Sequence, residues 1–397
     1  MGNAYARMLE DAEVAGLFEP VPVLQAMLDL ERALVLEQAA LGMVASAHAA
    51  TVSDCCSLEG LQADDLVVRA AEAGSLAIPL VQALRAKVRS RDEQALAAVH
   101  VGATSQDLID SALSVQGLKA MACIDVRLER ILRAILRLQQ AHGAEPLLAR
   151  TLMQPAAVTV LEHRLINWAM PLHRCRERLA QCAQEALTLQ LSGPVGTAAA
   201  WGAKAGALRE GVARRMALPL QPFSWQVQRD RLARLAAELG ITAGALGKVA
   251  IDVALMSQAE VDELQESSAP GRGGSSAMPH KRNPVGAMVA LSALQSAPQR
   301  VAAVIGSMAQ SQERALGPWQ AEGAELVELW LIVAGAASAM AQALEGAVVN
   351  PQAVRAHVSA FEQAHGAFQK DDGLRAERGR WWAQLAQELT PPTRSEE

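Results

Sequence analysis

A stretch of small and polar residues at 267–284, SSAPGRGGSSAMPHKRNP, interrupts an otherwise helical sequence. Irregular segments of this length are uncommon inside a helical protein and usually carry function. Ser275 follows two glycines, whose conformational freedom lets backbone N–H groups point toward one place. Lys281 and Asn283 add a positive charge and a neutral donor, a set that suits a carboxylate and the charge developing on it during a reaction. A solvated basic loop is the alternative.

A second polar cluster, HVGATSQD at 100–107, leads into a helical pattern that starts at Leu108. Thr104, Ser105 and Asp107 are residue types that cap helices by accepting hydrogen bonds from backbone N–H groups. The N–H groups at such a helix start also bind anions, and nearby hydroxyls assist them. Both a plain helix cap and an anion site fit this pattern.

Three segments resemble motifs of the fumarase/aspartase superfamily, in the expected order. GSSAMPHKRNP at 274–284 resembles the signature GSSxMPxKxNP, GATSQD at 102–107 resembles the carboxylate-binding TSxD segment, and ARTLMQPA at 149–156 resembles RTHxQxA. Within the superfamily, the chain most resembles the bacterial 3-carboxy-cis,cis-muconate cycloisomerase family, over most of residues 15–350.

This resemblance implies roles for the matched residues. Ser275 would be the catalytic serine on a mobile loop, and Lys281 and Asn283 would bind a substrate carboxylate. The other substrate-binding candidates are His100, Thr104, Ser105, Gln106, Gln154, Arg229 and Arg314. For the two arginines, a structural ion pair is an equally open alternative.

The resemblance also implies an all-α fold, fumarase/aspartase-like, with a long central helical bundle. We expect an N-terminal helical domain at 1–98, the bundle with the motifs at 99–345, and a short C-terminal segment at 346–397 with a disordered tail. Four chains would form a homotetramer with active sites shared between subunits. No cofactor and no metal are expected, and the substrate would be a small polycarboxylate from aromatic compound degradation.

Leu152 stands where lyases of the superfamily carry a histidine that serves the leaving group. Amines and hydroxide need protonation to leave, so a missing acid argues against their elimination. In lactonisation, the substrate's own carboxylate forms the new bond, and its pKa of about 4 keeps it ionised at neutral pH. The sequence therefore favours a cycloisomerase that lactonises 3-carboxy-cis,cis-muconate or a substituted or sulfonated analogue through an enediolate, with Ser275 transferring the proton.

Two alternatives remain open. One is a lyase of the same superfamily that eliminates a stable anion, such as nitrite, from a substituted succinate. The other is a non-catalytic helical scaffold. Pro155, where cycloisomerases often have histidine, and the short C-terminus leave the choice of substrate open.

Apolar residues at helical spacing predict the elements that position these residues. The stripes lie at 21–42, 110–141, 156–188, 228–265, 285–312 and 322–346. Gly240, Gly244 and Gly247 within one stripe indicate a neighbouring helix at close range, or else a break near Gly240. We expect a loop at 142–156 and a short hairpin at Leu187–Leu191.

Composition narrows the class of protein further. A net charge of −6 argues against a nucleic-acid-binding protein, and 51% hydrophobic residues suffice for a large core. Five cysteines, an odd number, without a CxxC pair argue against a disulfide framework or a zinc site. The apolar stretch 329–344 is short for a membrane span and predicts a buried helix. These features are typical of a cytoplasmic enzyme without a membrane partner.

Overall fold

The computed structural model describes residues 4–267, 272–367 and 373–390, and most of these residues are helical. Contacts between Cα atoms divide the chain into two compact units. Unit 1 comprises Met1–Cys123, Leu179–Leu239 and Pro298–Leu331, and unit 2 comprises Ile124–Arg178, Gly240–Ala297 and Ile332–Glu397. Each unit is described by itself below.

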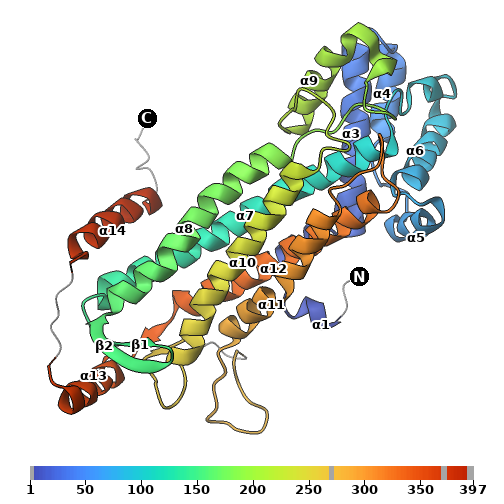
Figure 1. Cartoon of the computed structure of the whole chain (residues 1–397). Helices are drawn as coiled ribbons and strands as arrows, with labels where there is room; N and C mark the ends of the chain where they lie inside the picture. The colour runs from blue at the N-terminus through green and yellow to red at the C-terminus, as the bar shows by residue number, and fades with distance from the viewer. Residues whose placement is uncertain (1–3, 268–271, 368–372, 391–397) are drawn as a thin grey trace, which may run out of the picture. The chain divides into compact units, whose positions relative to one another are not determined.

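Five long helices contribute residues to both units (Figure 1). They are α7 (Ser105–His142), α8 (Leu161–Ala186), α10 (Asp230–Met256), α11 (Val285–Gly306) and α12 (Pro318–Glu345). The helical stripes are confirmed, although α8, α10 and α11 are shorter than the stripes at 156–188, 228–265 and 285–312. The fold is the all-α class that the periodicity predicts.

Unit 1 contains the N-terminal helices and a core that is rich in leucine. These elements are α1 (Ala4–Arg7), α2 (Ala12–Leu17), α3 (Pro20–Ala40), α4 (Ser46–Cys55), α5 (Ala63–Ala73), α6 (Ala77–Arg91) and the short 3-10 helix η1 (Gln94–Ala98). A second 3-10 helix η2 (Ala199–Lys204) and α9 (Ala205–Met216) follow later in the chain. Helix α3 packs against α4 and α9, and its Leu24, Met27 and Leu34 are 1% exposed.

In unit 2, a β-hairpin occupies part of the segment 142–156, which the sequence predicted as a loop. Strand β1 (Pro146–Thr151) pairs antiparallel with β2 (Gln154–Val160), and the register shifts between Ala149 and Arg150. Pro155 lies opposite Arg150, next to this irregularity, where a strand tolerates the missing N–H of proline. The loop prediction was therefore wrong, because Pro146 begins a strand and Pro155 lies beside the irregularity, both positions where strands tolerate proline.

The predicted hairpin at Leu187–Leu191 was also wrong. Leu189 makes only an isolated parallel bridge with Leu220 in the part of the chain that the structure describes. The short segment is held by a distant partner in unit 1 instead of by a neighbouring strand, which sequence spacing does not reveal.

Close helix packing in unit 2 explains one of the three glycines in α10. A Cβ at Gly247 would lie 2.7 Å from the Leu294 side chain of α11, so any larger residue would force that side chain to move. A Cβ at Gly244 would meet nothing within 4 Å. Helix α10 continues through Gly240 without a break.

Two helices, α10 and α12, are long and apolar enough to cross a membrane by length and composition alone. The most apolar window of each is 50% and 56% buried within the structure, respectively. The stretch 329–344 lies inside α12, where Leu329, Trp330 and Val333 are fully buried. The buried helix predicted there is confirmed.

The C-terminal part of unit 2 begins with β4 (Val348–Val349), which pairs with β3 (Leu264–Gln265). Helices α13 (Pro351–His365) and α14 (Arg375–Leu389) follow. The predicted domain boundaries fall at the ends of η1 and α12. The three-part division stays a prediction, and the predicted disordered tail lies, from residue 391, outside the described residues.

Candidate active site

The described part of the signature loop, 272–284 in unit 2, is anchored where it leaves the helices. The Arg272 guanidinium donates to Gln342 Oε1 of α12 at 2.9 Å. The Glu266 carboxylate accepts from two backbone N–H groups in the first turn of α11, at 2.9 and 2.8 Å. A carboxylate at a helix N-terminus satisfies donors that have no partner within the helix.

Between these anchors the loop folds back on itself. The Asn283 N–H donates to the carbonyl oxygen of Gly273 at 2.8 Å, and Asn283 Nδ2 lies 3.4 Å from the carbonyl oxygen of Gly274. Gly273 has a φ of +69°, and a Cβ there would lie 2.6 Å from the Asn283 carbonyl oxygen. Glycine is required at 273 both for the backbone conformation and for this close contact.

Ser275 and Lys281 both lie on this loop. The Ser275 hydroxyl oxygen accepts from the Met278 N–H at 3.1 Å. The backbone amide that contacts this hydroxyl is therefore that of Met278, and not one of the amides of Gly273 and Gly274. The Ser275 hydroxyl proton therefore stays available for donation. Lys281 is exposed and makes no ion pair with any residue that the structure describes, which leaves its charge available to an anion.

In unit 1, the start of α7 is closed by reciprocal hydrogen bonds. The Thr104 N–H donates to Asp107 Oδ2, and the Asp107 N–H donates to the Thr104 carbonyl oxygen, both at 3.0 Å. The Asp107 carboxylate also accepts from the N–H groups of Ser192 and Gly193 at 2.9 and 3.0 Å. Burial raises the Asp107 pKa to about 6, and the hydrogen bonds it accepts limit this rise. Asp107 thus links the segment SGPVG at 192–196 to the start of α7 by hydrogen bonds.

Arg314 reaches the same helix start. Its Nη2 donates to Thr104 Oγ1 at 2.7 Å and to the Pro194 carbonyl oxygen at 3.3 Å. The guanidinium lies 6.0 Å from the ring centroid of Trp319. Ser105, the first residue of α7, is half-buried beside this pair. The structure therefore brings three predicted carboxylate ligands together at one helix N-terminus.

His100, four residues before Thr104, is paired with a buried carboxylate. Its Nδ1 contacts Glu31 Oε1 of α3. Burial lowers the His100 pKa, but the hydrogen bond and the negative charge of Glu31 raise it by more, so the net pKa lies above its ordinary value.

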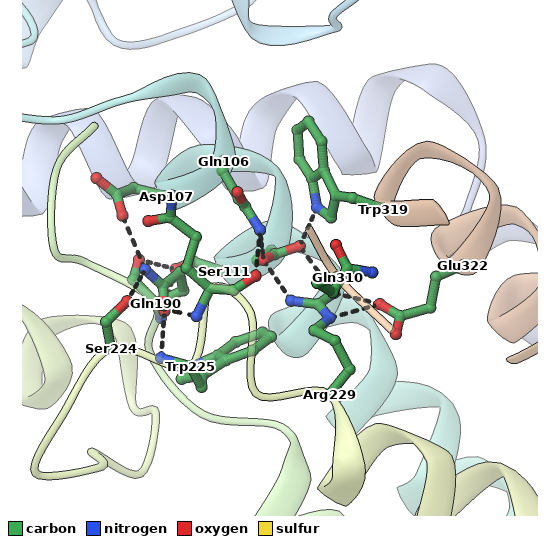
Figure 2. A network of polar contacts seen from close by, with 12 residues as sticks. Gln106, Asp107, Ser111, Gln190, Ser224, Trp225, Arg229, Gln310, Trp319 and Glu322 are labelled. Atoms are coloured by element: carbon green, nitrogen blue, oxygen red, sulfur yellow. Dashed lines mark hydrogen bonds and ion pairs between the residues drawn. The ribbon is translucent and has the colours of Figure 1, made fainter. Parts of the chain in front are cut away.

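Gln106 and Arg229 lie instead in a buried polar network of unit 1 (Figure 2). Gln106 Nε2 donates to Asp110 Oδ2 at 3.1 Å and to the Gln226 carbonyl oxygen at 2.9 Å. Arg229 is 2% exposed and forms ion pairs with Asp110, at 2.8 Å, and with Glu322. For Arg229, this geometry supports the structural ion pair that the sequence left open.

Gln154 lies in unit 2, beside the turn of the β1–β2 hairpin. The turn residues Leu152 and Met153 have φ values of +50° and +66°, a conformation that such side chains rarely adopt. Leu152 is 96% exposed, and Gln154 is exposed as well. The segment that resembles RTHxQxA is therefore presented at a hairpin tip.

The predicted site residues thus form two sets. His100, Thr104, Ser105 and Arg314 lie at the start of α7 in unit 1, with Gln106 and Arg229 buried in the same unit. Gln154, Ser275, Lys281 and Asn283 belong to unit 2. Among the described residues, no group of three or more His, Cys, Asp or Glu residues could hold a metal ion.

Glu31, the carboxylate that contacts the site candidate His100, is a residue that sequence reasoning missed. It lies on the apolar face of α3 and is 1% exposed, with Leu28 and Val35 equally buried nearby in the sequence. A charged residue at a core position of a helical stripe is the signal that could have found it.

Comparison with known proteins assigns the chain to a class. The model of the lyase family matches residues 38–297, and the chain belongs to this family. A fumarate lyase of Mesorhizobium has the same fold at 24% identity, with a TM-score of 0.80 over 96% of this chain and 87% of its own. The fumarase/aspartase-like fold is confirmed.

Within the family, the chain is similar to cycloisomerases. It is 38% identical to the 3-carboxy-cis,cis-muconate cycloisomerase of Bradyrhizobium diazoefficiens, over 89% of this chain and 79% of the relative. The corresponding protein of Pseudomonas aeruginosa is 39% identical over 87% of this chain and 75% of the relative. The crystal structure of the 3-carboxy-cis,cis-muconate lactonizing enzyme of Pseudomonas putida has a TM-score of 0.85 at 33% identity and covers 98% and 88% of the two chains.

Proposed function

We propose that the chain is a cycloisomerase that lactonises 3-carboxy-cis,cis-muconate or a close analogue. Support comes from relatives of this name at 38% and 39% identity over most of their length. The substrate would be a small tricarboxylate, and the enzyme would act in the cytoplasm in the degradation of protocatechuate. No cofactor takes part in this proposal.

The observation that carries the proposal is the residue at the hairpin tip. Leu152 is 96% exposed there, at the position that resembles the leaving-group histidine of related lyases. A leucine offers no proton, so an amine or hydroxide would lack the acid that its departure needs. Ring closure by a substrate carboxylate needs no proton on the attacking oxygen, because that group is already ionised.

The proposed reaction assigns a step to each loop residue. A substrate carboxylate adds to the conjugated double bond and closes a five-membered lactone, and the electron pair moves onto a second carboxylate as an enediolate. Lys281 and Asn283 stabilise this charge, together with the Thr104 hydroxyl and the Ser105 N–H at the start of α7. Ser275 then donates its hydroxyl proton to carbon, and the resulting alkoxide regains a proton from water.

We also propose a homotetramer with active sites shared between subunits. Leu152 and Met153 are 96% and 66% exposed in the single chain, and large apolar residues at a hairpin tip favour burial by another chain. The two sets of site residues belong to different units, which fits an assembly in which one chain supplies the α7 start and another supplies the loop.

Replacement of Ser275 tests the proposed function. In Ser275→Ala, turnover of 3-carboxy-cis,cis-muconate should fall by about 10²- to 10⁴-fold, since proton transfer by a positioned group contributes that much. The neighbouring Ser276→Ala is the matched control and should retain activity. Unchanged turnover in Ser275→Ala would remove the catalytic assignment.

A second function is favoured by one relative. The nitrosuccinate lyase of Streptomyces davaonensis is 35% identical over 84% of this chain and 72% of the relative. Nitrite leaves as a stable anion and also needs no acid at position 152. Parallel assays separate the two functions: the diene absorbance of the muconate is lost in lactonisation, whereas nitrosuccinate yields nitrite and fumarate.

A further inference from the structure

Glu31 is a buried carboxylate with one partner among the described residues. It lies in the middle of α3 and is 1% exposed, inside the hydrophobic core of unit 1. Among the described residues, its side chain is paired with His100 alone. A carboxylate at such a position is costly unless it is paired and hydrogen-bonded, so its occurrence in the core needs a reason.

The segment that carries His100 is held in an unusual conformation. His100 has a φ of +60°, which non-glycine residues adopt rarely and mostly where the surroundings impose it. The Val101 carbonyl oxygen accepts from Gln38 Nε2 at 2.9 Å and from Trp201 Nε1 at 3.1 Å. The Val99 carbonyl oxygen accepts from Arg85 at 3.4 Å. These bonds fix the backbone on both sides of the imidazole.

The Glu31 contact determines what the ring can offer. Because Nδ1 is engaged by Glu31, only Nε2 is left for another partner, and the His100 side chain is 19% exposed. Three charged groups act on the ring: Glu31 of α3 and Asp107 of α7 raise its pKa, whereas Arg85 of α6 lowers it, and burial lowers it as well. The net rise favours the ring with protons on both nitrogens, in which Nε2 donates.

We propose that Glu31 is a positioning residue, which holds His100 as a charged donor toward a substrate carboxylate beside Thr104 and Arg314. This inference rests on the proposed function, because it takes the α7 start as a carboxylate site. A charged N–H donor binds a carboxylate more strongly than a neutral one. Ligand binding at this end of the site should then weaken as the pH rises through the His100 pKa.

Glu31→Gln is the central variant, because it keeps the shape and an acceptor oxygen but removes the charge. We expect KM to rise by about tenfold near neutral pH with little change in kcat, since the lost charge weakens a carboxylate contact that is present in both ground and transition states. The pH at which KM begins to rise should move lower by about one unit. Glu37→Gln is the control on the same helix, since Glu37 pairs with Arg215 at 2.8 Å and should change neither quantity.

His100→Asn is the second variant, because asparagine tolerates a positive φ and keeps the backbone conformation. It should bind substrate more weakly and lose the pH dependence of KM between neutral and alkaline pH. Adding Glu37→Gln to either variant should not restore substrate binding, because Glu37 pairs with Arg215 and not with His100.

NMR titration of the His100 ring separates failure of this inference from failure of the proposed function. In Glu31→Gln, the ring should titrate about one pH unit lower than in the unaltered chain. The tricarboxylate probe tricarballylate should shift the His100 resonance below that pKa, even if neither muconate nor nitrosuccinate is turned over. An unchanged titration in Glu31→Gln, or no response of His100 to the probe at any pH, would overturn the inference.

Discussion

Two arginines in unit 1 occupy different surroundings. Arg229 is buried between the carboxylates of Asp110 and Glu322, whereas Arg314 is half-buried and donates to the Thr104 hydroxyl at 2.7 Å. A buried guanidinium that compensates two carboxylates is a structural group, because its removal leaves their charges unpaired. A partly exposed guanidinium at a helix N-terminus can still contact a ligand.

Substitution of the two arginines should therefore affect different quantities. Arg229→Met is expected to lower the free energy of unfolding by about 3–5 kcal/mol, the cost of breaking a buried pair. Arg314→Met should change stability by less than about 1 kcal/mol and raise KM instead. Urea unfolding and steady-state kinetics measure the two effects. A stable Arg229→Met protein with a raised KM would contradict this assignment.

The His100–Glu31 pair should make stability depend on pH in a definite direction. The folded-state pKa of His100 lies above the ordinary value of about 6.5, so folding favours the protonated ring. The stabilising contribution is fully present below about pH 6.5 and is lost as the pH rises through the folded-state pKa. Urea unfolding of the unaltered chain and of His100→Asn from pH 5.5 to 9 checks this: their difference in unfolding free energy should shrink with rising pH. A growing difference would refute it.

At the scale of elements, the signature loop depends on the first glycine of its Gly273-Gly274 pair. Gly273 has a φ of +69° and lies against the Asn283 carbonyl, whereas a Cβ at Gly274 would meet nothing within 4 Å. Gly273 is therefore needed for the backbone conformation of the loop, whereas position 274 has space for a larger side chain.

Gly273→Ala should lower kcat by about tenfold or more, because small displacements of reacting groups cost that much. Gly274→Ala is the matched control and should have a much smaller effect. Steady-state kinetics of both variants, with circular dichroism to confirm folding, measures the difference. Equal rates in the two variants would show that the loop conformation at 273 does not matter.

At the scale of the whole molecule, the two sets of site residues lie in different units of the chain. Sites shared between subunits predict complementation, at low substrate concentration, between variants impaired in different units. Refolding a mixture of Ser275→Ala and Arg314→Met chains should restore about one active site in four, since each complete site needs the loop from one chain and the α7 start from another.

A second mixture provides the control. Ser275→Ala and Lys281→Met alter the same loop, so every site in mixed tetramers keeps one defect and activity should not return. Activity in neither mixture would argue that each chain supplies its own complete site. Size-exclusion chromatography with light scattering checks that mixed tetramers form.

Sequence reasoning succeeded where local pattern decides structure. The long helices follow from apolar residues at helical spacing, and α12 contains the buried stretch at 329–344 as predicted. It failed at the 142–156 segment, where two prolines suggested a loop but occupy strand positions that tolerate them. The hairpin expected at Leu187–Leu191 is a bridge to Leu220, a distant partner that no local pattern reveals.

The sequence by itself determined the helices, the signature loop and the residue types available for chemistry, because each depends on neighbours within a few positions. Only the tertiary structure decided which polar groups meet. Glu31 and His100 are 69 positions apart, Arg229 and Glu322 are 93 apart, and Thr104 and Arg314 are 210 apart. Whether a charged side chain is buried in an ion pair or left open to a ligand depends on such distant contacts, since burial sets the cost of an unpaired charge.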